Sequence, residues 1–192
     1  MPDIVALITS QHRQVDELLE QAEQDSSAAP ALLRKVADLL RPHSQAEESF
    51  VYPRIAELQP EEAEEVHDGT AEHHHAEQLL DELLAGGPDQ PGWDGKLAAL
   101  AGELRHHVEE EESDLLPVLA EHASAEELEE LGNRFAAETG SSEVRPDALT
   151  GAGAPADGTS KTELYERAKD LDVPGRSTMT KEELSEAITE NS

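Results

Sequence analysis

Apolar side chains recur every three or four residues over most of residues 3–138, which is the spacing of one face of an α-helix. No stretch alternates apolar and polar residues as a half-buried strand would. The pattern predicts four long helices, at residues 3–24, from after Pro30 to Leu58, from after Pro60 to the Gly- and Pro-rich stretch at 85–92, and from Trp93 to His122. Pro117 is expected to disturb the last turns of the fourth helix. Ser124 and Glu127 have the spacing of a capping box and predict a shorter fifth helix that ends near Glu138.

Four long helices joined by short loops predict an all-α fold, an up-down-up-down four-helix bundle over residues 1–138. The composition then changes. Residues 139–159 are rich in Gly, Ala and Pro and have no apolar periodicity, which predicts a flexible linker. Two further capping-box spacings predict two short helices over residues 160–192, separated by LDVPGRSTM, which we call the C-terminal module.

Two segments of the predicted bundle are repeated. HRQVDELL, which begins at His12, corresponds to HHHAEQLL, which begins at His73, because each histidine precedes a Leu-Leu pair by six residues. LRPHSQAEESFVYP corresponds to LRHHVEEEESDLLP, because His43 and His107 each precede a glutamate by four residues and a proline by ten. The repeat predicts that one helix hairpin was duplicated and that a pseudo-twofold axis passes through the bundle.

Histidine interrupts the apolar face of each long helix. The residues placed inward by helical spacing are His12, His43, Glu47, His73, His107 and Glu111. A single inward histidine is usually an ordinary core residue. Four imidazoles and two carboxylates in one core, however, require a compensating positive charge. We therefore predict a pair of metal ions, and nitrogen and oxygen donors without sulfur favour iron or manganese.

The third helix offers a choice, because three histidines follow one another there. We favour His73 over His74 as the inward residue, since the repeat aligns His73 with His12. The remaining histidines lie off the inward faces and are expected to be solvated: His67, His106 and His122.

The net charge limits the partners that the chain can bind. It carries 44 acidic and 14 basic residues, a formal net charge of −30, which repels nucleic acid and anionic membranes. It contains no cysteine, which excludes disulfides, zinc–thiolate sites and iron–sulfur clusters. No apolar run approaches the roughly 20 residues that cross a bilayer, and the first residues lack the features of a signal peptide. We therefore expect a cytoplasmic protein with no membrane partner.

The repeated histidines and glutamates resemble those of the hemerythrin-like family, also called HHE cation-binding domains, over about residues 3–138. The resemblance implies two iron ions in an oxo- and carboxylate-bridged di-iron centre. It further implies these roles: terminal ligands His12, His43, His73 and His107, and bridges Glu47 and Glu111. Respiratory members carry a second histidine one turn after the third-helix histidine, where this chain has Glu77. Glu77 is therefore a candidate seventh ligand or a residue that orients His73.

The family resemblance implies that the protein binds or senses dioxygen or a related small redox molecule. One alternative is a di-iron enzyme with peroxidase- or catalase-like activity on a peroxide-type substrate, whose path passes near Phe50 and Tyr52. Iron buffering or storage and a metal-free interaction scaffold are further alternatives. The C-terminal module resembles SAP and Rho N-terminal domains, which implies a small helix-extended-helix fold, and such domains often contact nucleic acid. Because residues 160–192 carry more acids than bases, we expect a protein partner there at least as readily as DNA.

Overall fold

A computed structural model describes residues 3–145, 171 and 187–188 of this chain. Residues 3–145 are mainly helical, contain no strand, and lie within one compact unit, residues 1–152. The all-α fold class is therefore confirmed for the described part of the chain. The predicted linker beyond residue 145 and the predicted module at 160–192 lie, apart from single positions, outside the described residues.

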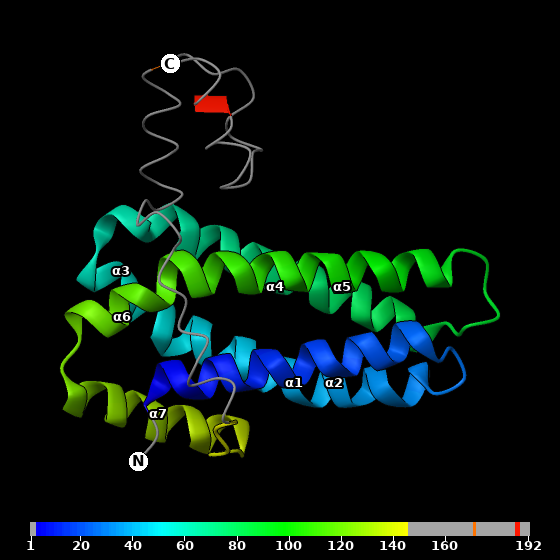
Figure 1. Cartoon of the computed structure of the whole chain (residues 1–192), viewed down its shortest axis with the longest axis horizontal. Helices are drawn as coiled ribbons and strands as arrows, with labels where there is room; N and C mark the ends of the chain where they lie inside the picture. The colour runs from blue at the N-terminus through cyan, green and yellow to red at the C-terminus, as the bar shows by residue number, and fades with distance from the viewer. Residues whose placement is uncertain (1–2, 146–170, 172–186, 189–192) are drawn as a thin grey trace. The chain divides into compact units, whose positions relative to one another are not determined.

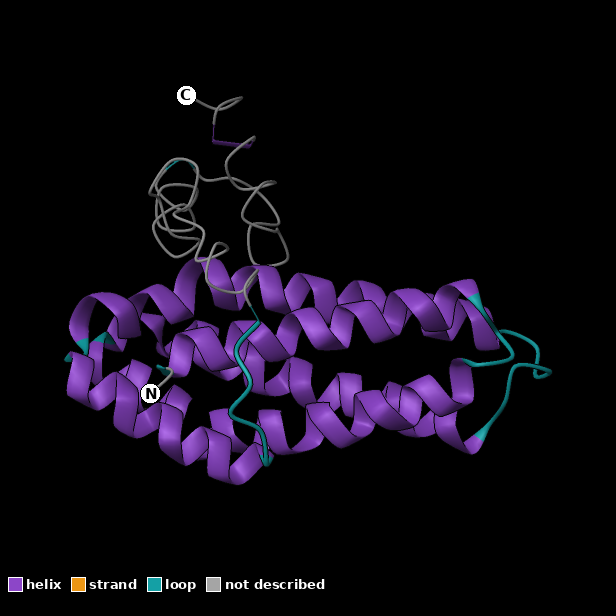
Figure 2. Ribbon diagram, turned by 60° about the horizontal axis from the view of Figure 1, so that its bottom comes forward, coloured by secondary structure: helices purple, strands orange, loops and turns teal. Residues whose placement is uncertain are grey.

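The long helices pack in pairs. The α-helices are α1 (Ile4–Gln24), α2 (Ala29–Ala46), α3 (Tyr52–Leu58), α4 (Ala63–Ala85), α5 (Trp93–Glu110), α6 (Leu116–His122) and α7 (Ala125–Thr139). α1 packs on α2 and α4 packs on α5, while α1 also contacts α5 and α2 contacts α4. Figures 1 and 2 show these four helices side by side, and α7 packs on α1 and α2. None of the described helices is both long enough and apolar enough to cross a bilayer.

Local sequence explains where several helices begin and end. The Asp3 side chain accepts a hydrogen bond from the backbone N–H of Ala6 and caps α1. Ser124 caps α7 in the same way by accepting from the backbone N–H of Glu127. α7 ends at Gly140, whose φ of 71° is a left-handed conformation that favours glycine.

The predicted second and fourth helices are each interrupted by a π-helical turn. These turns are η1 (Glu47–Val51) and η3 (Glu111–Leu115), so the fourth helix is disturbed near Pro117, as predicted, whereas the turn before Pro53 was not predicted. Pro53 and Pro117 follow the two turns and have no N–H to donate to the preceding helix. The chain inserts one extra residue there, and the N–H of Tyr52 and of Leu116 bonds a carbonyl five residues back.

The apolar core divides into two clusters. One is formed by α1, α2, α4 and α5 and includes Leu19, Leu33, Leu80 and Leu100. The other is formed at the opposite end by α1, the end of α2, η1, α3, η3, α6 and α7 and includes Phe135. The buried histidines fall between the two clusters along each long helix. The fold therefore places a polar layer inside an apolar bundle.

Candidate metal centre

The polar layer consists of two overlapping groups of nitrogen and oxygen atoms. The first group contains His12, His43, Glu47 and Glu111, and the second contains Glu47, His73 and His107. In each group every residue offers one ligand atom, and these atoms lie within 4.8 Å of one another. Glu47 belongs to both groups, whereas Glu111 belongs to the first.

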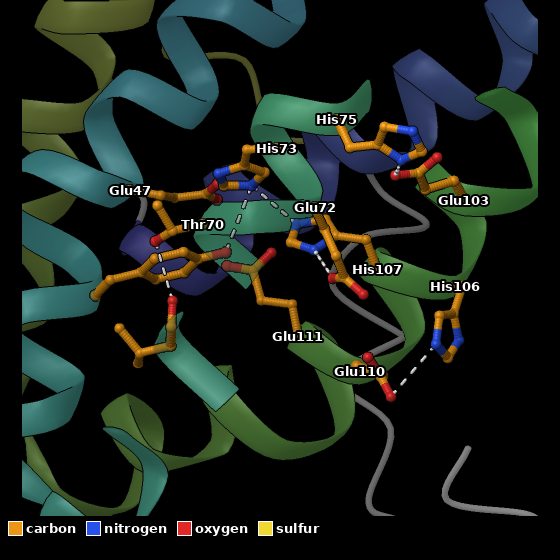
Figure 3. Close-up of polar contacts among 12 residues, drawn as sticks. Glu47, Thr70, Glu72, His73, His75, Glu103, His106, His107, Glu110 and Glu111 are labelled. Atoms are coloured by element: carbon orange, nitrogen blue, oxygen red, sulfur yellow. Dashed lines mark hydrogen bonds and ion pairs between the residues drawn. The ribbon is translucent and has the colours of Figure 1, made fainter. Parts of the chain in front are cut away.

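The histidine Nε2 atoms converge in pairs. The Nε2 atoms of His12 and His43 lie 3.2 Å apart, and those of His73 and His107 lie 2.9 Å apart. Glu47 connects the pairs, because its Oε1 is 2.9 Å from Nε2 of His43 and its Oε2 is 3.3 Å from Nε2 of His73. Figure 3 shows Glu47 beside His73 and places His107 next to Glu72.

The two central carboxylates are buried and contact no polar group except histidine nitrogens among the described residues. Glu47 is 0% exposed and Glu111 is 1% exposed. None of their four side-chain oxygens has a hydrogen-bond partner among the described residues, apart from their ion-pair contacts with histidine nitrogens. Burying a carboxylate without a counter-charge costs roughly several kcal/mol, even after the surrounding protein has relaxed. The donor set therefore fits metal cations, which are the counter-charge that imidazole and carboxylate ligands both accept.

Each inward histidine is held from behind through its Nδ1 atom. Nδ1 of His12 lies 2.9 Å from Glu112 and Nδ1 of His73 lies 3.1 Å from Glu48. Glu112 comes directly after Glu111 in the sequence, and Glu48 comes directly after Glu47. Each of these partners belongs to the hairpin that does not contain the histidine it contacts. A carboxylate accepts the Nδ1–H, so Nε2 is the nitrogen that is left to bind a cation.

His43 and His107 are each held by a residue of their own hairpin. This residue is Gln11, directly before His12, for His43 and Glu72, directly before His73, for His107. Nδ1 of His43 lies 3.0 Å from the Gln11 amide oxygen, and Nδ1 of His107 lies 2.9 Å from a Glu72 carboxylate oxygen. The pseudo-twofold pattern therefore extends to the outer partners, with one difference. The partner is a neutral amide for His43 and a carboxylate for His107, so the two halves of the site differ electrostatically.

The pKa values show how strongly the carboxylates act on these imidazoles. Burial lowers the pKa of His12, but the carboxylates of Glu111 and Glu112 outweigh it and raise the pKa to about 9. Burial likewise opposes protonation of His73, yet Glu47 and Glu48 raise its pKa to about 10. Burial raises the pKa of Glu47, but the imidazoles of His43 and His73 hold it well below its ordinary value. In the metal-free protein, protons therefore supply the positive charge that the carboxylates require.

Two aromatic side chains cover the layer on the side of the second core cluster. The Tyr52 ring is stacked on the His73 ring at 5.6 Å, and its hydroxyl lies 3.5 Å from Nε2 of His73. Gly69 makes room for it, since a Cβ there would lie 3.1 Å from the Tyr52 hydroxyl. Phe135 of α7 meets the His43 ring edge-on at 5.5 Å. Burial, followed by Glu111 and Glu47, raises the pKa of Tyr52 well above its ordinary value, so it keeps its proton.

The structure brings six of the seven predicted site residues together. Glu77 is half-buried and belongs to neither group. His73 is 1% exposed and joins the second group, whereas the side chain of His74 is 67% exposed and lies 3.6 Å from Glu48. His67 and His122 are exposed, as predicted, but His106 is half-buried in a third group with Glu72 and Glu110.

Sequence reasoning missed the outer partners, which are Gln11, Glu48, Glu72 and Glu112. A signal was present, because each of them directly precedes or follows a predicted ligand at equivalent positions of the repeat. Tyr52 was expected only beside a peroxide path, and the repeat did not indicate its contact with His73, since Leu116 stands at the equivalent position.

With this geometry established, the family can be identified from sequence comparison. Residues 3–119 match the family described as the hemerythrin HHE cation binding domain. The chain belongs to the hemerythrin HHE family. The comparison supports cation binding by this HHE domain, and the two groups of buried histidines and glutamates are compatible with it.

One curated relative is similar to most of this HHE protein. It is a protein named DNA nickase from Nostoc sp. (strain PCC 7120), 27% identical over 138 residues. The match covers 70% of this chain but 38% of the relative, so the chain spans well under half of that protein's length. No solved structure matches the chain.

Proposed function

We propose that this HHE domain holds two iron ions and binds or senses dioxygen or a related small redox molecule. The supporting observation is the set of buried carboxylate oxygens of Glu47 and Glu111, whose only polar contacts among the described residues are with histidine nitrogens. Nitrogen and oxygen donors without sulfur suit iron, and manganese is the alternative metal.

In this proposal the bundle has up-down-up-down topology, and its ligands form two iron positions. His12, His43 and Glu111 serve the first position, while His73 and His107 serve the second. Glu47 serves both, because its two oxygens lie next to histidines of different pairs. Two adjacent iron ions would supply the electrons for binding or reducing an oxygen-containing molecule. The outer partners fix the orientation of each imidazole, which keeps Nε2 directed at the cations.

The proposal is tested by metal analysis of Glu47→Gln against Glu77→Gln. Both changes replace a carboxylate by an amide, but only Glu47 belongs to the groups. We expect two iron ions per chain in the wild type, loss of both in Glu47→Gln, and full loading in Glu77→Gln. The optical spectrum of the anaerobically reduced protein, before and after air, then shows whether dioxygen binds reversibly. Equal metal content in all three proteins would contradict the assignment of the site.

A peroxide-consuming enzyme is the second candidate, and Tyr52 is the observation that favours it. Its protonated hydroxyl lies 3.5 Å from Nε2 of His73, inside the buried layer. A hydroxyl there can donate a hydrogen bond to an oxygen atom held at the second position, which is a role in peroxide chemistry. Peroxide turnover that is lost in Tyr52→Phe, with metal content unchanged, would favour this candidate over simple binding.

The relative's name does not lead us to propose DNA cleavage for this chain. The match omits most of that protein, and a formal net charge of −30 opposes DNA binding. A protein partner for residues 160–192 and a cytoplasmic location remain predictions from the sequence.

A further inference from the structure

A cavity of about 300 Å³ lies between α1 and α5 and reaches His12. Its apolar lining consists of Val15 and Leu19 from α1 and Leu104 and Val108 from α5. Val108 is half-buried, while the other three are 8% exposed or less. We call this space the α1–α5 cavity. Its volume exceeds that of a few water molecules and suits a small organic molecule or a dissolved gas.

The charges around the α1–α5 cavity cancel in pairs. Arg13 donates to Glu112 at 2.6 Å, and Arg105 donates to Asp16 at 2.7 Å. Glu109 also lines the cavity and adds a further negative charge. The lining therefore has no excess positive charge to attract an anion, and its apolar part favours an uncharged molecule.

The α1–α5 cavity shares one residue, His12, with the candidate metal centre. His12, which is 4% exposed, lines the cavity and directs Nε2 at the carboxylate of Glu111, 3.1 Å away. Glu112 joins His12 to Arg13, because one of its oxygens accepts from His12 Nδ1 and the other accepts from Arg13. The Arg13–Glu112 pair therefore lies between solvent and the buried histidine.

The repeat aligns the two valines of the cavity with smaller and more buried side chains of the other half of the bundle. The repeat aligns Val15 with Ala76 and Val108 with Ser44, which are 1% and 2% exposed. Arg13 aligns with His74, which also lies against an outer carboxylate, that of Glu48. The pseudo-twofold symmetry is thus broken at Arg13, Val15 and Val108, which are three of the residues that line the α1–α5 cavity.

We propose that the α1–α5 cavity is the entrance through which a small uncharged molecule reaches the His12 side of the centre. Its apolar lining holds the molecule, and the Arg13–Glu112 pair restricts the opening. This proposal rests on the proposed function, because it assumes that the molecule is destined for the metal ions. It differs from the path past Phe50 and Tyr52 considered above, since those two side chains are 6% and 1% exposed and pack in the second core cluster.

The first experiment tests the cavity without any metal. Xenon under pressure is added to the metal-free full-length chain, and methyl NMR signals are recorded, because xenon enters apolar cavities. We expect xenon-dependent shifts at Val15, Leu19, Leu104 and Val108, and loss of these shifts in Val108→Phe. Val5→Phe serves as the control, because Val5 is also a half-buried valine but lies in α1 and does not line the cavity. This variant should keep the xenon-dependent shifts. Shifts that persist in Val108→Phe, or that never appear in the wild type, would overturn the proposal.

The second experiment measures entry into the iron-loaded protein by stopped-flow mixing with dioxygen. If the cavity is filled, dioxygen can enter only when the helices open locally. We therefore expect Val108→Phe to react at about one tenth of the wild-type rate or more slowly still. Val108→Met is a milder change and should give an intermediate rate, which guards against misfolding of the larger variant. Arg13→Met should react faster, because it removes the charged pair without touching a ligand.

Metal content separates failure of the entrance from failure of the function. If all variants hold the same iron and react at the wild-type rate, the entrance is refuted while the metal centre stands. If the wild type itself holds no iron, the proposed function fails, and the xenon measurement alone decides whether the cavity admits an uncharged molecule.

Discussion

The free energy of unfolding of the metal-free protein should fall as the pH rises from about 6.5 to about 10. The folded protein raises the pKa of His12 from an ordinary 6.5 to about 9, and that of His73 to about 10. A raised pKa means that the folded state holds these protons more tightly than the unfolded chain does. The stabilisation is therefore complete below about pH 6.5 and is lost as the pH passes through the folded pKa values.

The size of this effect follows from the two pKa values. A change from 6.5 to about 9 corresponds to roughly 3 kcal/mol for His12. A change from 6.5 to about 10 corresponds to roughly 5 kcal/mol for His73. The two histidines share the carboxylates of Glu47 and Glu111, so the combined loss is smaller than the sum. Even a loss of roughly 3 kcal/mol is a large part of the 5–15 kcal/mol that typically holds a protein folded.

The assay is urea unfolding, followed by circular dichroism, of the metal-free protein between pH 6 and pH 10 (the range is set by these pKa values). Glu112→Gln removes one carboxylate that raises the pKa of His12, so its stability should depend less steeply on pH. His122→Ala changes an exposed histidine and serves as the control. The metal-loaded protein should not lose stability over this range, because bound cations replace the protons. A metal-free protein whose unfolding midpoint is flat or rises with pH would refute this reasoning.

Further predictions concern single side chains of the centre. Glu111→Gln should weaken binding at the first position more than at the second, because Glu111 belongs to the first group, whereas Glu47→Gln should empty both; metal analysis distinguishes the two outcomes. Glu72→Gln should lower metal affinity roughly 10–100-fold, because it removes the carboxylate that orients His107; competition with a chelator measures this, and unchanged affinity would exclude that role. Tyr52→Phe should keep both metal ions but change the optical spectrum of the protein with azide, and an identical spectrum would show that the hydroxyl is too far away to matter.

The sequence by itself determined which helix faces carry the chemistry. His43 and Glu47 are four residues apart, so a helix places them on one side whatever surrounds it. The burial of both residues follows from their positions among Leu40 and Phe50, which the same period directs inward. The repeat aligned His73 rather than His74 with His12, and helical spacing places His73 on the inward face, where it is 1% exposed.

Only the tertiary structure decided how neighbouring residues are used. Glu48 and Glu112 lie one position beyond the central glutamates, about 100° further around a helix, where contact depends on how closely the next helix approaches. The π-turns at Glu47 and Glu111 also shift these residues, and the spacing of apolar residues does not reveal an inserted residue. Glu77 lies one turn after His73, yet its side chain belongs to neither group.

The difference between the two halves of the site was likewise set by packing between helices. Tyr52 reaches His73 because Gly69 of α4 leaves space for its ring, and the two residues come from segments that the sequence does not pair. The α1–α5 cavity has the same origin, since Val15 and Val108 meet across two helices that are far apart in the chain. Helical periodicity acts within one helix and fixes which residues face inward, whereas contacts between helices depend on side-chain volumes that must fit together in three dimensions.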